Sequence, residues 1–173
     1  MSDPIAANAR GKWSQHGVPH RDWQCIATRD LREEGEEYMI CEMCEVQTIR
    51  FVHTMVHPDY PETLDCGCDC AGYMEGNKRR AKERDSDMRR RAARRQKFPD
   101  RKGWKVSAKG NPHVKVDGYH CIVARRSNGY SVGITPPLAE RPTWGSRTYR
   151  TLREAQEGCF DAIEHMRPGK RRT

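Results

Sequence analysis

The sequence has few apolar residues and no long run of them. Hydrophobic residues make up 35% of the 173 positions and aromatic residues 8%, with three phenylalanines. No stretch approaches the ~18 consecutive apolar residues that a membrane-spanning helix needs, so we expect no membrane segment. A chain with so few apolar residues forms a modest core, and a modest core favours a structural metal or another crosslink.

The start of the chain also lacks the pattern of a secretory signal. Residues 1–5, MSDPI, contain no basic segment followed by an apolar one, and we therefore expect a cytoplasmic location. Thiols stay reduced in the cytoplasm, so the eight cysteines predict metal ligands rather than a disulfide framework. No phosphate loop, dinucleotide fingerprint or nucleophile elbow is present, so no small-molecule substrate is indicated.

Five of the cysteines and two histidines fall between positions 41 and 70. A C-x-x-C pair comes first, a C-x-C-x-C cluster comes last, and the histidines lie between them. A C-x-x-C turn between two strands is typical of a zinc knuckle, which presents two thiolates to one tetrahedral ion. We expect zinc to be held by Cys41, Cys44, Cys68 and Cys70, with Cys66, His53 and His57 as alternative ligands.

The residues around these cysteines predict a zinc-binding module over residues 38–75. Residues 46–57 are rich in β-branched side chains and predict a strand, which Pro58 ends. A helix is expected from Ala71, which would place Cys70 at its first turn, where the helix dipole favours a thiolate. The resulting order of strand, knuckle, strand, loop and helix is that of a treble-clef or zinc-ribbon module. Residues 1–37 are expected to be an N-terminal extension with a short strand over 18–26.

A basic helix is expected over residues 76–99, ended by Pro99. Residues 78–105 contain 14 Lys or Arg and 4 Asp or Glu, a local charge of +10, whereas the whole chain carries +8. Such a segment predicts contacts with phosphates, for which the arginine fork is suited. The residues expected to contact nucleic acid are Arg79, Arg80, Arg84, Arg89, Arg90, Arg91, Arg94, Arg95, Lys97, Arg101 and Lys102.

Residues 100–168 predict a separate α+β domain, a three-stranded antiparallel sheet packed on one helix. Asn128-Gly129 lies between two alternating runs, 119–126 and 130–135, and is a strong hairpin signal. A third strand is expected over 144–150.

The helix of this domain is expected over residues 152–166. Thr151 and Glu154 form a capping box at its start. Gly158 weakens the helix by about 1 kcal/mol relative to alanine, so we expect it to allow a close approach to the sheet. Residues 169–173 would form a basic tail.

Several stretches together resemble an uncharacterised group of bacterial and mobile-element proteins. They are the C-x-x-C of Cys41 and Cys44, the run 49–57, and the segment 67–71 with its arginine-rich helix; the turn 109–111 adds to the likeness. The resemblance covers residues 20–165. It implies a zinc module with Cys68 and Cys70 as the second ligand pair, and it brings no known activity.

The second domain is also similar in layout to two known DNA-binding domains. These are the domain of plant ethylene-response factors and the arm-binding domain of phage integrases. Both place a three-stranded sheet in the major groove. The likeness is one of element order alone.

Together these features predict a zinc-stabilised nucleic-acid-binding protein of bacterial or phage/mobile-element type, with duplex DNA favoured over RNA as the partner. The alternative is a small phage- or element-encoded adaptor or inhibitor that binds a host protein or ribonucleoprotein. A zinc-stabilised nuclease ranks third, because His53, His57 and Asp59 are the only residues near the module that suit one and H-E-x-x-H is absent. We therefore expect no enzymatic activity.

Overall fold

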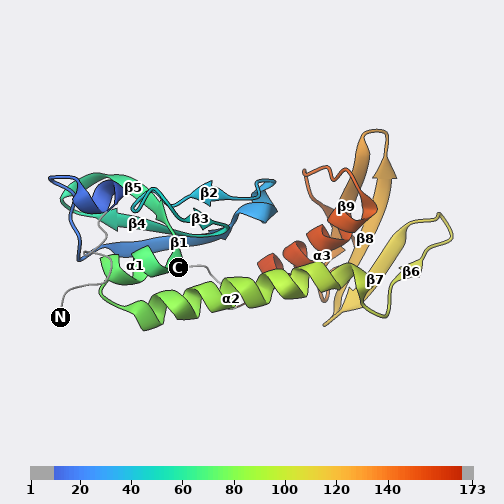
Figure 1. Ribbon diagram of the computed structural model, residues 1–173. Coiled ribbons are helices and arrows are strands. Elements are labelled where there is room, and N and C mark those ends of the chain that lie inside the picture. The colour runs from blue at the N-terminus through green and yellow to red at the C-terminus, as the bar shows by residue number, and fades with distance from the viewer. Residues whose placement is uncertain (1–9, 169–173) are drawn as a thin grey trace. The chain divides into compact units, whose positions relative to one another are not determined.

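The computed structural model describes residues 10–168. It combines helices with antiparallel sheets, as the sequence predicts, and its contacts divide the chain into two compact units between Ala92 and Ala93. Figure 1 shows their elements, and we call residues 10–92 the first unit and residues 93–168 the second. Within the described residues, no helix has the length and apolar character needed to cross a membrane. The predicted basic tail, 169–173, lies outside the described residues.

Two small antiparallel sheets build the first unit. The larger has the order β1-β4-β5 and the smaller pairs β2 with β3. The strands are β1 (Gln24–Asp30), β2 (Met39–Ile40), β3 (Thr48–Ile49), β4 (Phe51–His57) and β5 (Tyr60–Cys66). The short 3₁₀ helices η2 (Gly11–Ser14) and η3 (Leu31–Glu34) complete this part of the unit.

Strand β5 was not predicted, because its residues were expected to form a loop after Pro58. It lies at the edge of its sheet, where Pro61, which has no N–H to donate, is tolerated. Only Leu64 and Cys66 of its side chains are buried, so the strand has no clear hydrophobic alternation. Strand β1 also differs from the prediction, since it begins at Gln24 instead of residue 18 and continues to Asp30.

The helix expected from Ala71 and the basic helix expected over 76–99 are two separate helices, α1 (Cys68–Met74) and α2 (Lys78–Lys97). Gly76 separates them with a left-handed φ of 67°, a conformation that glycine adopts without a steric cost. α1 packs on β4. α2 ends at Lys97, as Pro99 predicts, and the 3₁₀ helix η4 (Phe98–Asp100) follows.

The second unit contains a five-stranded antiparallel sheet of order β10-β9-β8-β7-β6. Helix α3 (Leu152–Met166) packs on β8 and β9, as Figure 1 shows. The apolar core lies between them and includes Cys121, Val123, Val132, Ile134, Cys159 and Ile163. The strands are β6 (Lys105–Val106), β7 (Pro112–Val116), β8 (Tyr119–Arg126), β9 (Gly129–Thr135) and β10 (Thr143–Trp144).

The prediction of three strands was therefore wrong. β7 was missed because Pro112 follows a Gly-Asn turn, yet proline is tolerated as the first residue of a strand. The strand predicted over 144–150 is replaced by the short β10 and an isolated bridge between Tyr130 and Tyr149. The hairpin of β8 and β9 is confirmed, with Arg126 paired to Gly129.

Helix α3 begins as the capping box predicts, since the Glu154 backbone N–H donates to Thr151 Oγ1 at 3.1 Å. Gly158 was expected to allow a close approach to the sheet; the structure shows a close approach there, but to the ring of Tyr149, which lies outside the strands. A Cβ placed there would overlap the Tyr149 ring, with the Cε1 atom only 2.8 Å away.

We expect Gly158→Ala to destabilise the second unit by about 1 kcal/mol, because displacing the ring costs more than the gain in helix propensity. In a Tyr149→Ala background the ring is absent, so the same change should stabilise by about 1 kcal/mol. Urea unfolding of the four proteins of this cycle measures both effects. Equal effects of Gly158→Ala in the two backgrounds would contradict the steric explanation.

Candidate metal centre and basic sheet face

The loop between β2 and β3 holds the first two thiols of the centre. Cys41 and Cys44 lie in this loop, where the Glu45 backbone N–H donates to the Cys41 carbonyl at 2.8 Å and the Cys41 N–H donates to the Gln47 carbonyl at 2.8 Å. Glu45 takes a left-handed φ of 56°, which turns the chain back toward β3. The loop thus presents both side chains from one tight turn, as a C-x-x-C knuckle does.

The third thiol comes from α1. Cys70 lies in the first turn of that helix, and the ligand atoms of Cys41, Cys44 and Cys70 are all within 4.8 Å of one another. Cys41 and Cys70 are buried and Cys44 is partly exposed. These three predicted ligands are therefore close enough to hold one metal ion.

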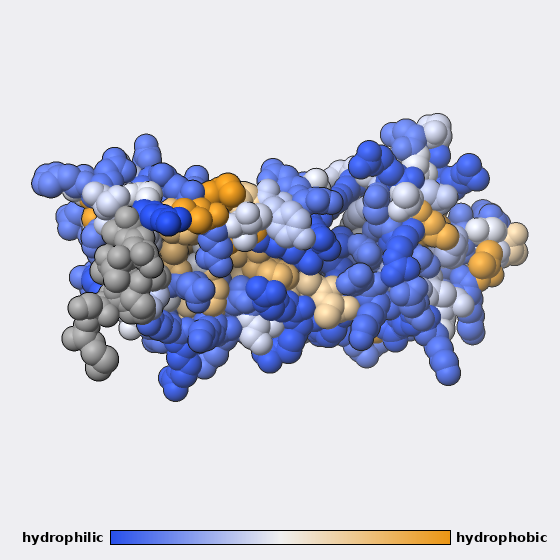
Figure 2. Space-filling model, viewed as in Figure 1, coloured by the Kyte–Doolittle hydropathy of each residue, from blue (hydrophilic) through white to orange (hydrophobic). Residues whose placement is uncertain are grey.

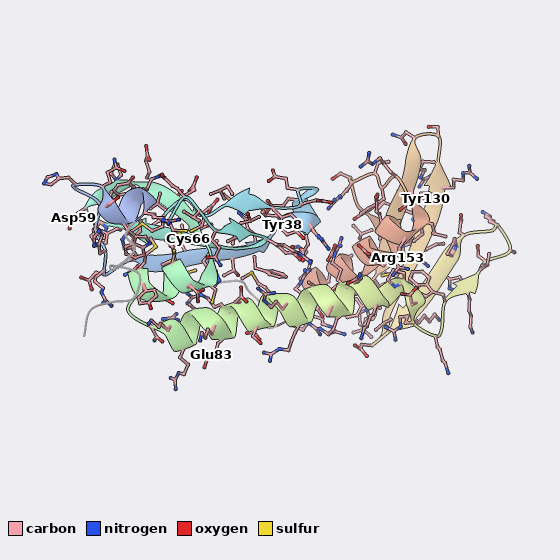
Figure 3. All side chains as sticks on the ribbon, in the orientation of Figure 1. Tyr38, Asp59, Cys66, Glu83, Tyr130 and Arg153 are labelled. Carbon is pink, nitrogen blue, oxygen red and sulfur yellow. The ribbon has the colours of Figure 1, made fainter. Side chains whose placement is uncertain are left out.

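Cys66 supplies a fourth sulfur beside this set. It is the last residue of β5, it is fully buried, and its Sγ donates to Met74 Sδ at 3.6 Å. Its thiol also lies close enough to Cys41 for the two groups to shift each other's pKa. Figure 3 labels Cys66 in the interior of the first unit, where several sulfur atoms gather. Cys66 was an alternative ligand in the sequence analysis, and the structure places it next to Cys41 but outside the group of three whose ligand atoms lie within 4.8 Å of one another.

The thiols of the centre share protons around Cys41. Hydrogen bonds from the thiols of Cys66 and Cys70, and from the backbone N–H groups of Cys44 and Gly67, hold the pKa of Cys41 well below its usual range. The same contacts, with burial, raise the pKa values of Cys66 and Cys70. Several cysteine sulfurs so close together cannot all be thiolates without a positive charge between them. A metal cation supplies that charge and binds several thiolates at once.

Trp13 closes the centre from the N-terminal side. Its ring is buried in the same core, and its Nε1 is buried without a hydrogen-bond partner among the described residues. Cys41 and burial raise the pKa of Cys70, and the nearby indole N–H offsets part of that rise, as a donor close to the sulfur does. An N–H group aimed at a thiolate is a common outer contact of thiolate metal sites, so Trp13 fits a metal at this place.

Cys68, predicted as the fourth ligand, lies in a different group. Its Sγ, one ring nitrogen of His53 and one carboxylate oxygen of Asp85 are all within 4.8 Å of one another. Burial, followed by the negative charges of Asp85 and Asp69, raises the pKa of Cys68 to about 11. Cys68 and Cys70 are separated because α1 starts at Cys68, and helical residues two apart do not face the same side.

The two histidines of β4 have different surroundings. His53 is fully buried, and burial followed by the nearby Arg84 lowers its pKa to about 4, so its imidazole is neutral near pH 7. His57 is partly exposed, packs its ring on Trp23, and accepts the backbone N–H of Asp59 on Nδ1 at 3.0 Å. His57 and Asp59 therefore cap the β4–β5 turn.

The predicted nucleic-acid contacts on α2 fall into two sets. Arg84, Arg91 and Arg95 are half-buried in ion pairs with acidic residues of their own units. Arg84 pairs with Glu75 at 2.6 Å and Arg91 pairs with Glu33. These arginines neutralise acids of the fold.

The remaining predicted contacts are exposed. Arg79, Arg89 and Arg90 pair only with acids one turn away on the same helix, and Arg94 lies 3.5 Å from Glu164. The other exposed members are Arg80, Lys97, Arg101 and Lys102.

The positive charge of the chain is concentrated in its second part. Residues 93–171 contain seventeen Lys or Arg against seven Asp or Glu, a net charge of +10. Residues 1–92 contain fourteen against seventeen, a net charge of −3, and Arg172 completes the total of +8. Figure 2 shows a largely hydrophilic surface over the second unit.

The sheet of the second unit turns one face to α3 and presents basic and aromatic side chains on the other. Strand alternation and register place Lys105, Lys115, Arg126 and Trp144 on this second face, and all four are exposed. The Arg126 guanidinium stacks 5.0 Å from the Trp144 ring and donates to Ser131 Oγ at 2.9 Å. We call this surface the sheet face; its residues are Lys105, His113, Lys115, His120, Ile122, Ala124, Arg126, Ser131, Gly133, Thr135 and Trp144.

Sequence analysis predicted the hairpin but not this surface. Lys115 was outside any predicted strand, so its position beside β8 was not foreseen. The signal that was available is the alternation of residues 112–116, in which Val114 is buried and Lys115 exposed.

Comparison with protein-family models, curated proteins and solved structures found no match to this chain. The resemblance to an uncharacterised mobile-element group therefore stays a prediction, and function rests on the geometry.

Proposed function

We propose that this protein is a zinc-stabilised nucleic-acid-binding protein that contacts duplex DNA through the sheet face of its second unit. The observation that carries the proposal is an exposed sheet surface without an acidic residue, in a segment whose net charge is +10. Lys105, Lys115 and Arg126 supply cations for phosphates, and Trp144 supplies an aromatic ring beside them.

The dimensions of a sheet support duplex DNA as the partner. Strands lie ~4.8 Å apart, so the three inner strands β7, β8 and β9 span ~10 Å and fit the major groove, which is ~12 Å wide. Lys105 on β6 and Trp144 on β10 would then lie toward the two phosphate backbones. Sheet-reading proteins dock in this way, with cations on the phosphates and neighbouring polar groups on base edges. His113 and His120, whose ring nitrogens are 3.1 Å apart on this face, could supply such polar groups.

Zinc would stabilise the first unit in this proposal. Thiolates suit zinc, which takes four sulfur ligands in structural sites, and Cys41, Cys44, Cys66 and Cys70 supply them. The order of knuckle, β4–β5 hairpin and α1 is that of a treble clef. When bound, the ion would join the knuckle loop to the first turn of α1, and so fix the small core around it.

The test compares two triple variants of equal charge loss. One is Lys105→Gln, Lys115→Gln and Arg126→Gln on the sheet face. The other is Arg79→Gln, Lys82→Gln and Arg90→Gln on the exposed side of α2, which serves as the control. Binding of the full chain to a ~20-base-pair duplex is measured over a range of salt by fluorescence anisotropy.

We expect the sheet-face variant to bind more weakly and its log–log salt slope to be shallower by about 2.7, because each lost phosphate contact removes ~0.9 of a counterion. The α2 variant should change the log–log salt slope by less than ~0.9, the amount expected for one phosphate contact. A larger loss in the α2 variant would assign binding to the helix instead. No binding to duplex or single strands at ~50 mM salt would overturn the nucleic-acid proposal.

A protein partner is a second candidate, and exposed apolar residues of the first unit favour it. Ile40 and Val46 flank the knuckle loop and are 49% and 53% exposed, and Tyr38 nearby is 52% exposed. Figure 2 shows apolar surface in the region of β2. Such a partner would bind through a few buried anchors, so salt would affect its affinity weakly. The salt series above therefore separates the two candidates.

A further inference from the structure

We propose that His53, Cys68 and Asp85 form a second, exchangeable site for a zinc-class divalent metal, separate from the cysteine centre. The three residues come from β4, α1 and α2 and offer one nitrogen, one sulfur and one oxygen within 4.8 Å of one another. The inference stands apart from nucleic-acid binding, since it depends only on the first unit.

An unsatisfied polar atom marks the site. His53 Nε2 is buried and has no hydrogen-bond partner among the described residues, and the His53 side chain is fully buried. A buried polar group without a partner costs about 1 to 3 kcal/mol, so a fold that keeps one there points to a ligand. The nearest acid, Asp85, places Oδ1 at 3.9 Å from this nitrogen.

That distance fits a shared metal better than a direct contact. It is too long for a hydrogen bond, which ends near 3.2 Å for N–H and O. Two ligands of one tetrahedral zinc, each ~2.0 to 2.1 Å from the ion, lie about 3.3 Å apart. The side chains thus need to close by about half an ångström around an ion.

The carboxylate of Asp85 is oriented for this role. Its Oδ2 accepts from Arg89 Nε at 2.6 Å, which leaves Oδ1 as the oxygen nearest His53. A metal ligand held from its far side by a second residue is the usual arrangement in metal sites. In a nucleophile–histidine–acid triad, the nucleophile and the acid contact opposite ring nitrogens of the histidine. Here the sulfur of Cys68 and a carboxylate oxygen of Asp85 gather around one ring nitrogen of His53, as the ligands of one ion do.

Arg84 sets the condition for occupancy. Its Nε lies 3.4 Å from His53 Nδ1 and is directed as a donor. An ion on Nε2 requires the ring proton on Nδ1, so it must displace this long contact, while Arg84 keeps its 2.6 Å pair with Glu75. The guanidinium is therefore an opposing charge, and the site should bind its ion more weakly than the cysteine centre does.

With three protein ligands, the site has a fourth position for water or another small ligand. Three-ligand zinc sites are those that exchange ligands, whereas four-ligand sites are structural. The mixed nitrogen, sulfur and oxygen set suits zinc or cobalt(II) rather than magnesium or calcium, which prefer oxygen alone.

The test is a cobalt(II) titration of the full chain, stripped of metal and kept reduced, followed by visible absorption. We expect the native chain to saturate at two ions. Cys68→Ala and Asp85→Asn should each saturate at one, and each should keep the sulfur-to-cobalt charge-transfer intensity that the first cobalt equivalent gives in the native chain, since the tighter cysteine centre fills first. That band shows that the first unit is still folded. Asp87→Asn, an exposed acid on the same helix, is the control and should bind two.

A further variant tests the role assigned to Arg84. Arg84→Gln removes the opposing charge and offers an acceptor to Nδ1–H, so we expect the second cobalt to bind about tenfold more tightly. Saturation of the native chain at one ion, or at two in both Cys68→Ala and Asp85→Asn, would overturn the proposal. If Cys68 belonged to the cysteine centre, Cys68→Ala would weaken the charge-transfer band of the first cobalt equivalent and Asp85→Asn would have no effect, which also refutes it.

Discussion

Cys41→Ser is expected to unfold the first unit and leave the second unit folded. The buried Cys41 Sγ lies within 4.8 Å of the Cys44 and Cys70 sulfurs and accepts the Gly67 backbone N–H at 3.5 Å, so it joins the knuckle loop to the start of α1. A structural zinc contributes about 10 to 16 kcal/mol in small domains, which exceeds or equals the ~5 to 15 kcal/mol of total stability that such folds have. A unit with this core has no reserve to replace it.

The measurement is an amide NMR spectrum together with the zinc content of the purified chain. Signals from residues 10–92 should collapse to unfolded positions and bound zinc should be lost, while signals from 93–168 stay dispersed. Cys25→Ser is the control, because that thiol donates to the Ala27 carbonyl at 3.3 Å and is not in the centre. A zinc-loaded, folded Cys41→Ser protein would contradict the assignment, and collapse of both units would show that they do not fold independently.

The thiols of the candidate metal centre could be predicted only in part from the sequence. The C-x-x-C spacing identifies Cys41 and Cys44, because a tight turn between strands brings both thiols to one place. Whether Cys66 or Cys68 lies nearer to the other thiols depends on where the strand before them ends and where the helix after them begins. Strand β5 ends at Cys66 and α1 begins at Cys68, and neither boundary has a sequence signal stronger than Gly67.

Strands β5 and β7 were the other part of the fold that the sequence analysis missed. Both contain a proline, which is acceptable in a sheet at an edge, as in β5, or as a strand's first residue, as in the internal strand β7. Central strands such as β8 are buried on one face by α3 and therefore show the alternation that predicts them. Local signals with a fixed geometry, such as the capping box at Thr151 and the Ser127-Asn128-Gly129 turn, were read correctly for the same reason.

The arginine-rich helix shows a third limit. Its charge is visible in the sequence, but the acids that neutralise its inner side are Glu33, Glu157 and Asp161, more than fifty positions away. A run of basic residues can therefore neutralise acidic residues of the same protein instead of binding a partner. The sequence alone does not distinguish these two roles, because it does not show which acids lie beside the run.

Arg95 provides the sharpest example, and its replacement is expected to destabilise the second unit. Arg95 Nη1 donates to Glu157 at 2.6 Å, and its Nε donates to Asp161 at 2.9 Å. The three side chains are 13%, 18% and 25% exposed, so they are largely shielded from water. Glu157 and Asp161 are one turn apart on α3, and the arginine holds the end of α2 against both.

Arg95→Gln should lower the free energy of unfolding of the second unit by about 2 to 3 kcal/mol. It leaves two partly buried carboxylates without their cation, which costs less than in a fully buried pair, where ~3 to 5 kcal/mol is typical. Arg141→Gln, an equal loss of charge at an exposed loop position of the same unit, should change stability by less than ~0.5 kcal/mol. Urea unfolding monitored by hydrogen exchange of β8 and α3 measures both.

This comparison also decides what the basic helix does at its C-terminal end. If Arg95 contacts phosphate, as the sequence predicts, Arg95→Gln should weaken DNA binding and leave stability close to that of Arg141→Gln. If it is a counter-charge for α3, stability falls, and DNA affinity measured well below the unfolding temperature stays within about twofold of the native value. The twofold limit corresponds to ~0.4 kcal/mol, far below the stability change, because the carboxylates already occupy the donors that a phosphate would need.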